Sequence, residues 1–98
     1  MASANQTLAA SGKEFECDNT QRTATISGVS GGYVRNLDAS VTAYLNVDGG
    51  TVATSNPTGD SGRSIPPGKV VQLPATCRAF TFKSASSIYL AYSKEDSY

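Results

Sequence analysis

Apolar and polar side chains alternate one by one along much of this chain, and glycine or proline interrupts the alternation about every 8–12 residues. Successive side chains of a β-strand point to opposite faces of a sheet, so this period of two predicts strands with one buried face. No segment keeps the helical apolar period of about 3.6 residues for long enough to predict a helix. Residues 8–10 come closest, and Ser11 and Gly12 end that run at once. The pattern therefore predicts an all-β protein.

The strongest predicted strand covers residues 40–47, where every second residue is apolar: Val41, Ala43, Leu45 and Val47. Asp48 and Gly49 follow it directly. An Asp-Gly pair between two β-rich runs favours a tight hairpin, because glycine adopts the positive φ that the turn requires. We therefore expect residues 51–54 to return as the partner strand.

Six further strands are predicted, at residues 13–17, 22–26, 33–36, 70–73, 78–83 and 88–92. No crossover helix is available to connect parallel strands, so the pairing must be mostly antiparallel. The predicted fold is a small antiparallel β-sandwich or a jelly-roll-like barrel of about eight short strands. We expect its core to contain Phe15, Ile26, Val41, Leu45, Val47, Val71, Leu73, Phe80, Phe82, Ile88 and Leu90.

The length of 98 residues suits one domain. We expect this domain at residues 13–93, with an N-terminal arm at residues 1–12 and a C-terminal tail at residues 94–98. The first seven residues carry neither a basic cluster nor an apolar run, so we expect no signal peptide. No segment reaches the roughly 20 apolar residues that a membrane-spanning helix needs.

The composition argues against catalysis and against a charged partner. The chain contains no histidine, which excludes the Ser-His-Asp and Cys-His nucleophile systems and histidine metal sites. Eight basic and eight acidic residues balance, so the composition favours neither nucleic acid nor a membrane as partner. Glu14 and Glu16 share a strand face, as a catalytic pair of carboxylates would. No second chemical group accompanies them, so charges on a solvated face are the favoured interpretation. We expect no catalytic residues, no cofactor and no metal; calcium at the Asp60 loop is an alternative.

Two cysteines leave two alternatives open. Cys17 and Cys77 either form a disulfide that closes a loop of about 60 residues, or remain separate buried thiols that pack as small apolar residues. Nothing else marks the chain as secreted, which favours the thiols. The disulfide would fit a small secreted domain or inhibitor.

Three regions are candidates for contact with a partner: the N-terminal arm, the polar loop at residues 55–62, and tyrosines on outer strand faces. The loop combines proline, glycine and small polar residues without an apolar anchor. The tyrosines either line one interface or are ordinary surface residues. The predicted partner-binding residues are Asn5, Thr7, Leu8, Tyr33, Tyr44, Asn56, Pro57, Asp60, Arg63 and Tyr89.

Residues 36–48 and 64–74 resemble parts of small structural proteins of tailed bacteriophages. In residues 64–74, an Ile-Pro-Pro-Gly turn precedes an apolar strand that ends at Pro74. Pro66 forces Ile65 into an extended conformation. The similarity extends over roughly residues 30–93 in strand order and turn chemistry, with residues 78–83 and 88–92 as the closing strands. The family is that of capsid decoration, or cement, proteins of the phage head.

The resemblance implies a non-enzymatic β-sandwich that binds and stabilises the assembled head. Its partner would be the major capsid protein or another virion protein, and a homotrimer is one assembly that the family allows. The chain would reside on the capsid surface of the virion, after synthesis in the host cytoplasm. The alternative is a carbohydrate- or receptor-binding β-sandwich module of a fibre or tail, which would use Tyr33, Tyr44 or Tyr89.

Overall fold

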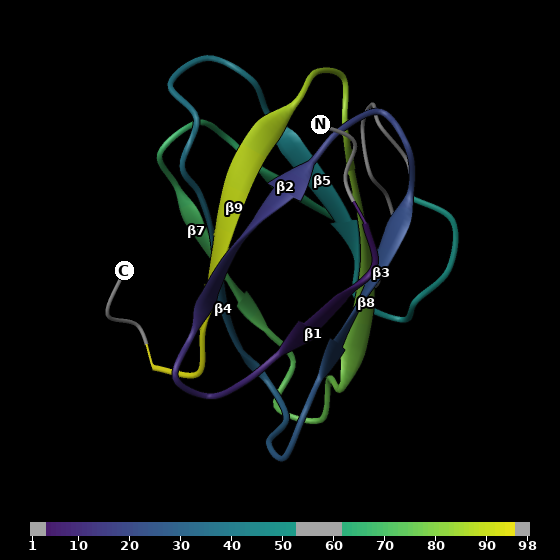
Figure 1. Ribbon diagram of the computed structural model, residues 1–98, viewed down its shortest axis with the longest axis vertical. Coiled ribbons are helices and arrows are strands. Elements are labelled where there is room, and N and C mark those ends of the chain that lie inside the picture. Colours follow the sequence, from purple (N-terminus) through teal and green to yellow (C-terminus); the bar gives the residue numbers. More distant parts are fainter. Residues whose placement is uncertain (1–3, 53–61, 96–98) are drawn as a thin grey trace.

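The computed structural model describes residues 4–52 and 62–95, and within these ranges the chain forms nine β-strands and no helix. The predicted all-β sandwich is confirmed. Figure 1 shows its two layers, which the strand pairing defines as a five-stranded sheet A, in the order β1-β3-β8-β5-β6, and a four-stranded sheet B, in the order β2-β9-β4-β7. The strands are β1 (Gln6–Leu8), β2 (Lys13–Cys17), β3 (Arg22–Ile26), β4 (Gly32–Asn36), β5 (Ala43–Asn46), β6 (Gly62–Ile65), β7 (Val70–Leu73), β8 (Ala79–Ser84) and β9 (Ile88–Ser93).

The antiparallel pairs are nested within one another along the chain. β2 pairs with β9, β3 with β8, β4 with β7, and β5 with β6. The chain therefore folds like one long hairpin. That ribbon then rolls up, because β4 also pairs with β9 and β5 also pairs with β8. Eight strands connected in this way form a jelly roll, the second of the two architectures that the sequence predicts.

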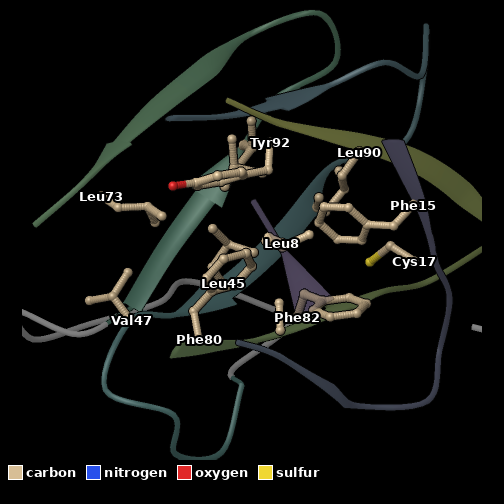
Figure 2. Packing of buried hydrophobic residues seen from close by; sticks show 14 of the residues in the cluster. Leu8, Phe15, Cys17, Leu45, Val47, Leu73, Phe80, Phe82, Leu90 and Tyr92 are labelled. Atoms are coloured by element: carbon tan, nitrogen blue, oxygen red, sulfur yellow. The ribbon is translucent and has the colours of Figure 1, made fainter. Parts of the chain in front are cut away.

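The space between the sheets holds one apolar core (Figure 2). Every core residue that the alternation predicts is buried except Val41 and Val71, which are partly buried and pack against the cluster. Phe15 of sheet B meets Phe82 of sheet A edge to face, with ring centroids 5.0 Å apart and an interplanar angle of 66°. Aromatic pairs prefer this arrangement, because the positive edge of one ring faces the negative face of the other.

The N-terminal arm predicted at residues 1–12 is part of the sheet from Gln6 onward. β1 pairs in parallel with β3, with Leu8 beside Ile26. The side chain of Leu8 is fully buried and belongs to the core cluster. A strand of three residues contains too few alternations to be recognised as a strand in the sequence. This parallel pair is the exception to the antiparallel pairing that the sequence predicts.

The hairpin predicted after residues 40–47 is wrong. β5 pairs with β6, with Ala43 opposite Ile65 and Tyr44 opposite Ser64. Residues 51 and 52 belong to no strand, and residues 53 and 54 lie outside the described ranges. The Asp-Gly turn itself forms, with the Gly49 amide donating to the carbonyl oxygen of Asn46 at 3.2 Å and a φ of +80° at Gly49. The turn therefore redirects the chain without returning it along β5.

Hydrogen bonds to sheet A explain where the chain goes after this turn. The Thr81 hydroxyl of β8 donates to the Gly50 carbonyl oxygen at 2.7 Å. The Val52 amide donates to the side-chain oxygen of Gln21 at 2.8 Å, and Val52 is buried. Residues 50–52 are thereby held against β8 and the start of β3, so they are not free to extend beside β5.

The predicted turn at residues 66–69 is confirmed and has a second function in the sheet. The Lys69 amide donates to the Pro66 carbonyl oxygen at 3.0 Å, and Gly68 has a φ of +75°, as a type II turn requires. Gly68 and Lys69 together face Asn36: the Gly68 amide donates to the Asn36 carbonyl, and the Asn36 amide donates to the Lys69 carbonyl. This is a G1 β-bulge, which bends the start of β7.

Candidate functional surface

The structure separates the predicted partner-binding residues into exposed and buried groups. Asn5 and Thr7 are exposed, and the side-chain oxygen of Asn5 accepts a hydrogen bond from the Thr23 amide at 3.0 Å. Leu8 is buried, so its side chain is not available to a partner in the folded protein. Arg63 is half-buried on β6. The remaining loop candidates, Asn56, Pro57 and Asp60, lie outside the described residues.

The three candidate tyrosines lie on two different sides of the sandwich. Val34 and Leu90 point into the core, so Tyr33 of β4 and Tyr89 of β9 lie on the outer face of sheet B. By the same alternation, Tyr44 of β5 lies on the outer face of sheet A. A single flat interface can therefore use Tyr33 and Tyr89 together, but not Tyr44 with them.

On the outer face of sheet B, the predicted Tyr89 lies beside Leu37, an apolar residue that the sequence analysis missed. Leu37 and Tyr89 are the exposed large hydrophobic residues of the described ranges, 40% and 55% exposed. The Leu37 amide donates to the Tyr89 carbonyl oxygen at 3.0 Å, so the two residues are cross-strand neighbours. The strand predicted at residues 33–36 ends before Leu37, although the alternation of Tyr33, Arg35 and Leu37 puts all three on one face.

The middle of the same face carries a row of residues from all four strands. Ala91 of β9 is the register partner of both Glu14 of β2 and Arg35 of β4, and Arg35 is in turn the partner of Val70 of β7. Ala91 is buried despite its outward direction, and so is Ser93 farther along β9. Small side chains therefore form the centre of the face, with the acidic Glu14 on one side of β9 and the basic Arg35 on the other.

The charged side chains of this face are incompletely paired within the described chain. The Arg35 guanidinium donates from Nη1 to the Gly68 carbonyl oxygen at 3.1 Å. Its Nε is a buried donor without a hydrogen-bond partner among the described residues. Glu14 is exposed, whereas the Glu16 carboxylate accepts a short hydrogen bond from the Ser87 hydroxyl. Glu14 is thus an exposed charge on one side of β9, and Arg35 is a half-buried charge on the other side.

The outer face of sheet A has a different character. Thr23 and Thr25 of β3, Thr81 and Lys83 of β8, and Tyr44 of β5 occupy its outward positions. Residues 50–52 lie against part of it, and Thr81 is buried. Hydroxyl groups therefore dominate this face, in contrast to the aromatic and charged face of sheet B.

The two cysteine thiols and the Asp38 carboxylate are held by burial or by hydrogen bonds within the fold. Cys17 and Cys77 are free buried thiols, so the disulfide alternative is wrong for this structure. Burial raises the pKa of the Cys17 thiol to about 11, and burial also raises the pKa of Cys77. The Ser40 and Val41 amides donate to the Asp38 carboxylate and lower its pKa, which ties a loop together. The two thiols are thus part of the core, and Asp38 holds its loop by hydrogen bonds.

Within residues 4–52 and 62–95, no group of three or more acidic, histidine or cysteine side chains gathers as a metal site requires. No pocket opens on the surface of these residues. The same part of the chain has no helix long and apolar enough to cross a membrane. The outer face of sheet B carries the exposed Leu37 and Tyr89 together with Glu14 and Arg35, and it is the candidate functional surface.

The buried thiols make the protein sensitive to alkali. The pKa of Cys17 is raised from 9.0 to about 11, so its stabilising effect is complete below pH 9 and is lost as the pH rises towards 11. A difference of two pKa units corresponds to about 2.7 kcal/mol of unfolding free energy. We expect urea denaturation to show this loss, and we expect Cys17→Ala to make the pH dependence shallower. An unchanged dependence in Cys17→Ala would contradict the burial of the thiol.

Comparison of the chain with protein-family models, curated proteins and solved structures finds no match in any of the three. The jelly-roll fold and the outer face of sheet B are therefore the features of this chain that bear on its function.

Proposed function

We propose that this chain is a non-enzymatic structural protein of a bacteriophage virion, which binds the assembled head and stabilises it. The observation that carries the proposal is the nested pairing of β2 to β9, because the jelly roll is a recurrent fold of viral capsid proteins. The resemblance of residues 36–48 and 64–74 to decoration proteins points the same way. The partner would be the major capsid protein or another virion protein, and the chain would reside on the capsid surface.

The surface chemistry supports binding as the mode of action. The chain lacks histidine, and both thiols are buried with raised pKa values. The outer face of sheet B, in contrast, offers tyrosine and arginine, which are enriched among the residues that dominate protein interfaces. A protein that binds only the assembled shell shifts the equilibrium towards that shell by mass action. No catalytic group is needed for this function.

The test is co-sedimentation with heads of the phage that encodes this chain, prepared without the protein. We expect saturable binding to assembled heads, a higher disruption temperature of the decorated heads, and no binding to unassembled capsid subunits. Tyr44→Ser and Tyr89→Ser are a matched pair for locating the contact, because the two tyrosines lie on opposite faces. Equal binding to free subunits, or no binding to heads, would contradict the proposal.

A carbohydrate- or receptor-binding module of a fibre or tail is the second candidate. The observation that favours it is the exposure of Tyr89 beside Leu37, because aromatic rings exposed on a surface can stack on apolar faces of a ligand. A glycan array distinguishes the two functions: this second candidate predicts glycan binding that Tyr89→Ser abolishes, whereas the head-binding proposal predicts none.

A further inference from the structure

The outer face of sheet B has a symmetric arrangement about β9. Glu14 of β2 lies on one side of Ala91, and Arg35 of β4 lies on the other side. Both residues are direct register partners of Ala91, so each is one strand spacing, about 4.8 Å, from β9. Their charges are opposite. A rotation by 180° about an axis along β9, lying in the plane of the face, therefore places the acid of one copy opposite the base of another.

We propose that two copies of this chain associate face to face through the outer face of sheet B, about a two-fold axis that runs along β9. Glu14 of each copy then faces Arg35 of the other, and the contact occurs twice. This is the self-complementary geometry that an isologous dimer requires. The proposal does not depend on the proposed head-binding function.

The residues along the axis suit a close approach of two sheets. Ala91 and Ser93 are small and lie low in the face, whereas Tyr89 at the end of β9 is 55% exposed. About this axis, Tyr89 of one copy meets Tyr89 of the other, and Leu37 lies next to it. The most exposed apolar surface of the described chain would thereby be covered on the dimer axis, at one end of β9.

The surroundings of the Arg35 guanidinium also favour a charged binding partner on this face. Its Nη1 bonds to a carbonyl oxygen of its own chain, and its Nε has no partner in the described chain. Glu14 is exposed and lies across β9 from Arg35. Glu14 of a second copy would bring a carboxylate over the half-buried Arg35 side chain. A neutral carbohydrate would leave both charges without an ionic partner.

The expected affinity follows from the size of the face. About an axis along β9, β2 of one copy lies over β4 of the other. Three strands about 4.8 Å apart and five residues of about 3.4 Å each make a shared face of roughly 14 by 17 Å. This is well below the roughly 800 Å² per partner of a stable, specific interface, so the dimer must be weak and transient. We therefore expect a dissociation constant on the order of 10–100 µM, that is, a dimer that forms at high local concentration.

Sedimentation equilibrium up to about 1 mM protein tests the proposal, because a dimer of this affinity dominates at that concentration. Glu14→Arg and Arg35→Glu each bring like charges together at both contacts, and like charges across an interface cost several-fold to many-fold in affinity. We expect each variant alone to associate at least about a hundredfold more weakly than the unchanged protein. Lys83→Glu on the outer face of sheet A is the matched control and is expected to leave the dimer intact.

The decisive measurement is a 1:1 mixture of the two variants. In a mixed dimer the reversed side chain at position 14 faces the reversed side chain at position 35 of the other copy, and the unchanged Arg35 and Glu14 face one another. We expect the mixture to dimerise although neither variant does so alone. Circular dichroism establishes that both variants are folded; Glu14→Arg changes an exposed residue and must abolish the dimer even if Arg35→Glu does not fold.

Three results would overturn the proposal. The first is a monomer throughout the concentration range, which would leave this face free for a different partner. The second is a dimer that neither charge reversal weakens, because the contact would then lie on another face. The third is a trimer, which has no two-fold axis to bring Glu14 opposite Arg35.

Discussion

Gly32→Ala is expected to lower the free energy of unfolding by about 4 kcal/mol, combining a clash in a packed core with a strained backbone. A Cβ atom at this position would lie 2.6 Å from the Tyr92 hydroxyl oxygen and 2.8 Å from the Ser93 carbonyl oxygen. The backbone φ of +118° adds strain for any residue with a Cβ. Tyr92 cannot move away easily, because it is fully buried and its hydroxyl donates to the Gly31 carbonyl oxygen at 2.6 Å. Thermal denaturation is expected to show a melting temperature lower by roughly 20 °C.

Gly28→Ala is the matched control for this substitution. Gly28 also has a positive φ, of +80°, but a Cβ atom there would meet nothing within 4 Å. Only the backbone strain remains, which costs about 1 kcal/mol. Equal losses in the two variants would mean that the contact between Gly32 and Tyr92 does not exist as described.

Leu8→Ala is expected to lower the free energy of unfolding by about 3 kcal/mol, because the side chain is fully buried and its removal leaves a cavity between the sheets. Thr7→Ala is the control on the same strand, where the side chain is exposed and the cost should stay within about 0.5 kcal/mol. Urea denaturation of both variants measures the difference. If Leu8→Ala is as stable as Thr7→Ala, β1 is not part of the folded domain.

The alternation of side chains was sufficient to predict the fold class and most of the core. Phe15, Phe80 and Phe82 alternate with polar residues and are buried as expected. The Pro-Pro-Gly turn was equally clear, because proline and glycine each fit one backbone conformation of a type II turn. These signals are local, and the structure retains each of them.

The pairing of the strands was not predictable in the same way. The Asp48-Gly49 turn is a local signal, whereas β5 pairs with β6 across a long connection that no local pattern encodes. Period two identifies the buried face of a strand but not its neighbours. For the same reason the sequence grouped Tyr44 with Tyr33 and Tyr89, although the sandwich places Tyr44 on the opposite side.

The residues of the candidate surface could be identified only from the register of β9 with β2 and β4. Glu14, Ala91 and Arg35 are far apart in the sequence and become neighbours because β9 pairs with β2 on one side and with β4 on the other. Leu37 joins this surface because the residue after β4 still hydrogen-bonds to β9, its amide donating to the Tyr89 carbonyl oxygen. A formal net charge of zero gives no sign of this arrangement, because the arrangement depends on where the charges lie on the sheet.

The nested pairing underlies both proposals, since it places Glu14, Tyr89 and Arg35 on one face. Cross-strand nuclear Overhauser effects in the isotopically labelled protein test it most directly. We expect contacts between the backbones of Phe15 and Leu90, of Val34 and Val71, and of Ala43 and Ile65. Contacts from Ala43 to residues 51–54 in place of Ile65 would restore the local hairpin and contradict the jelly roll.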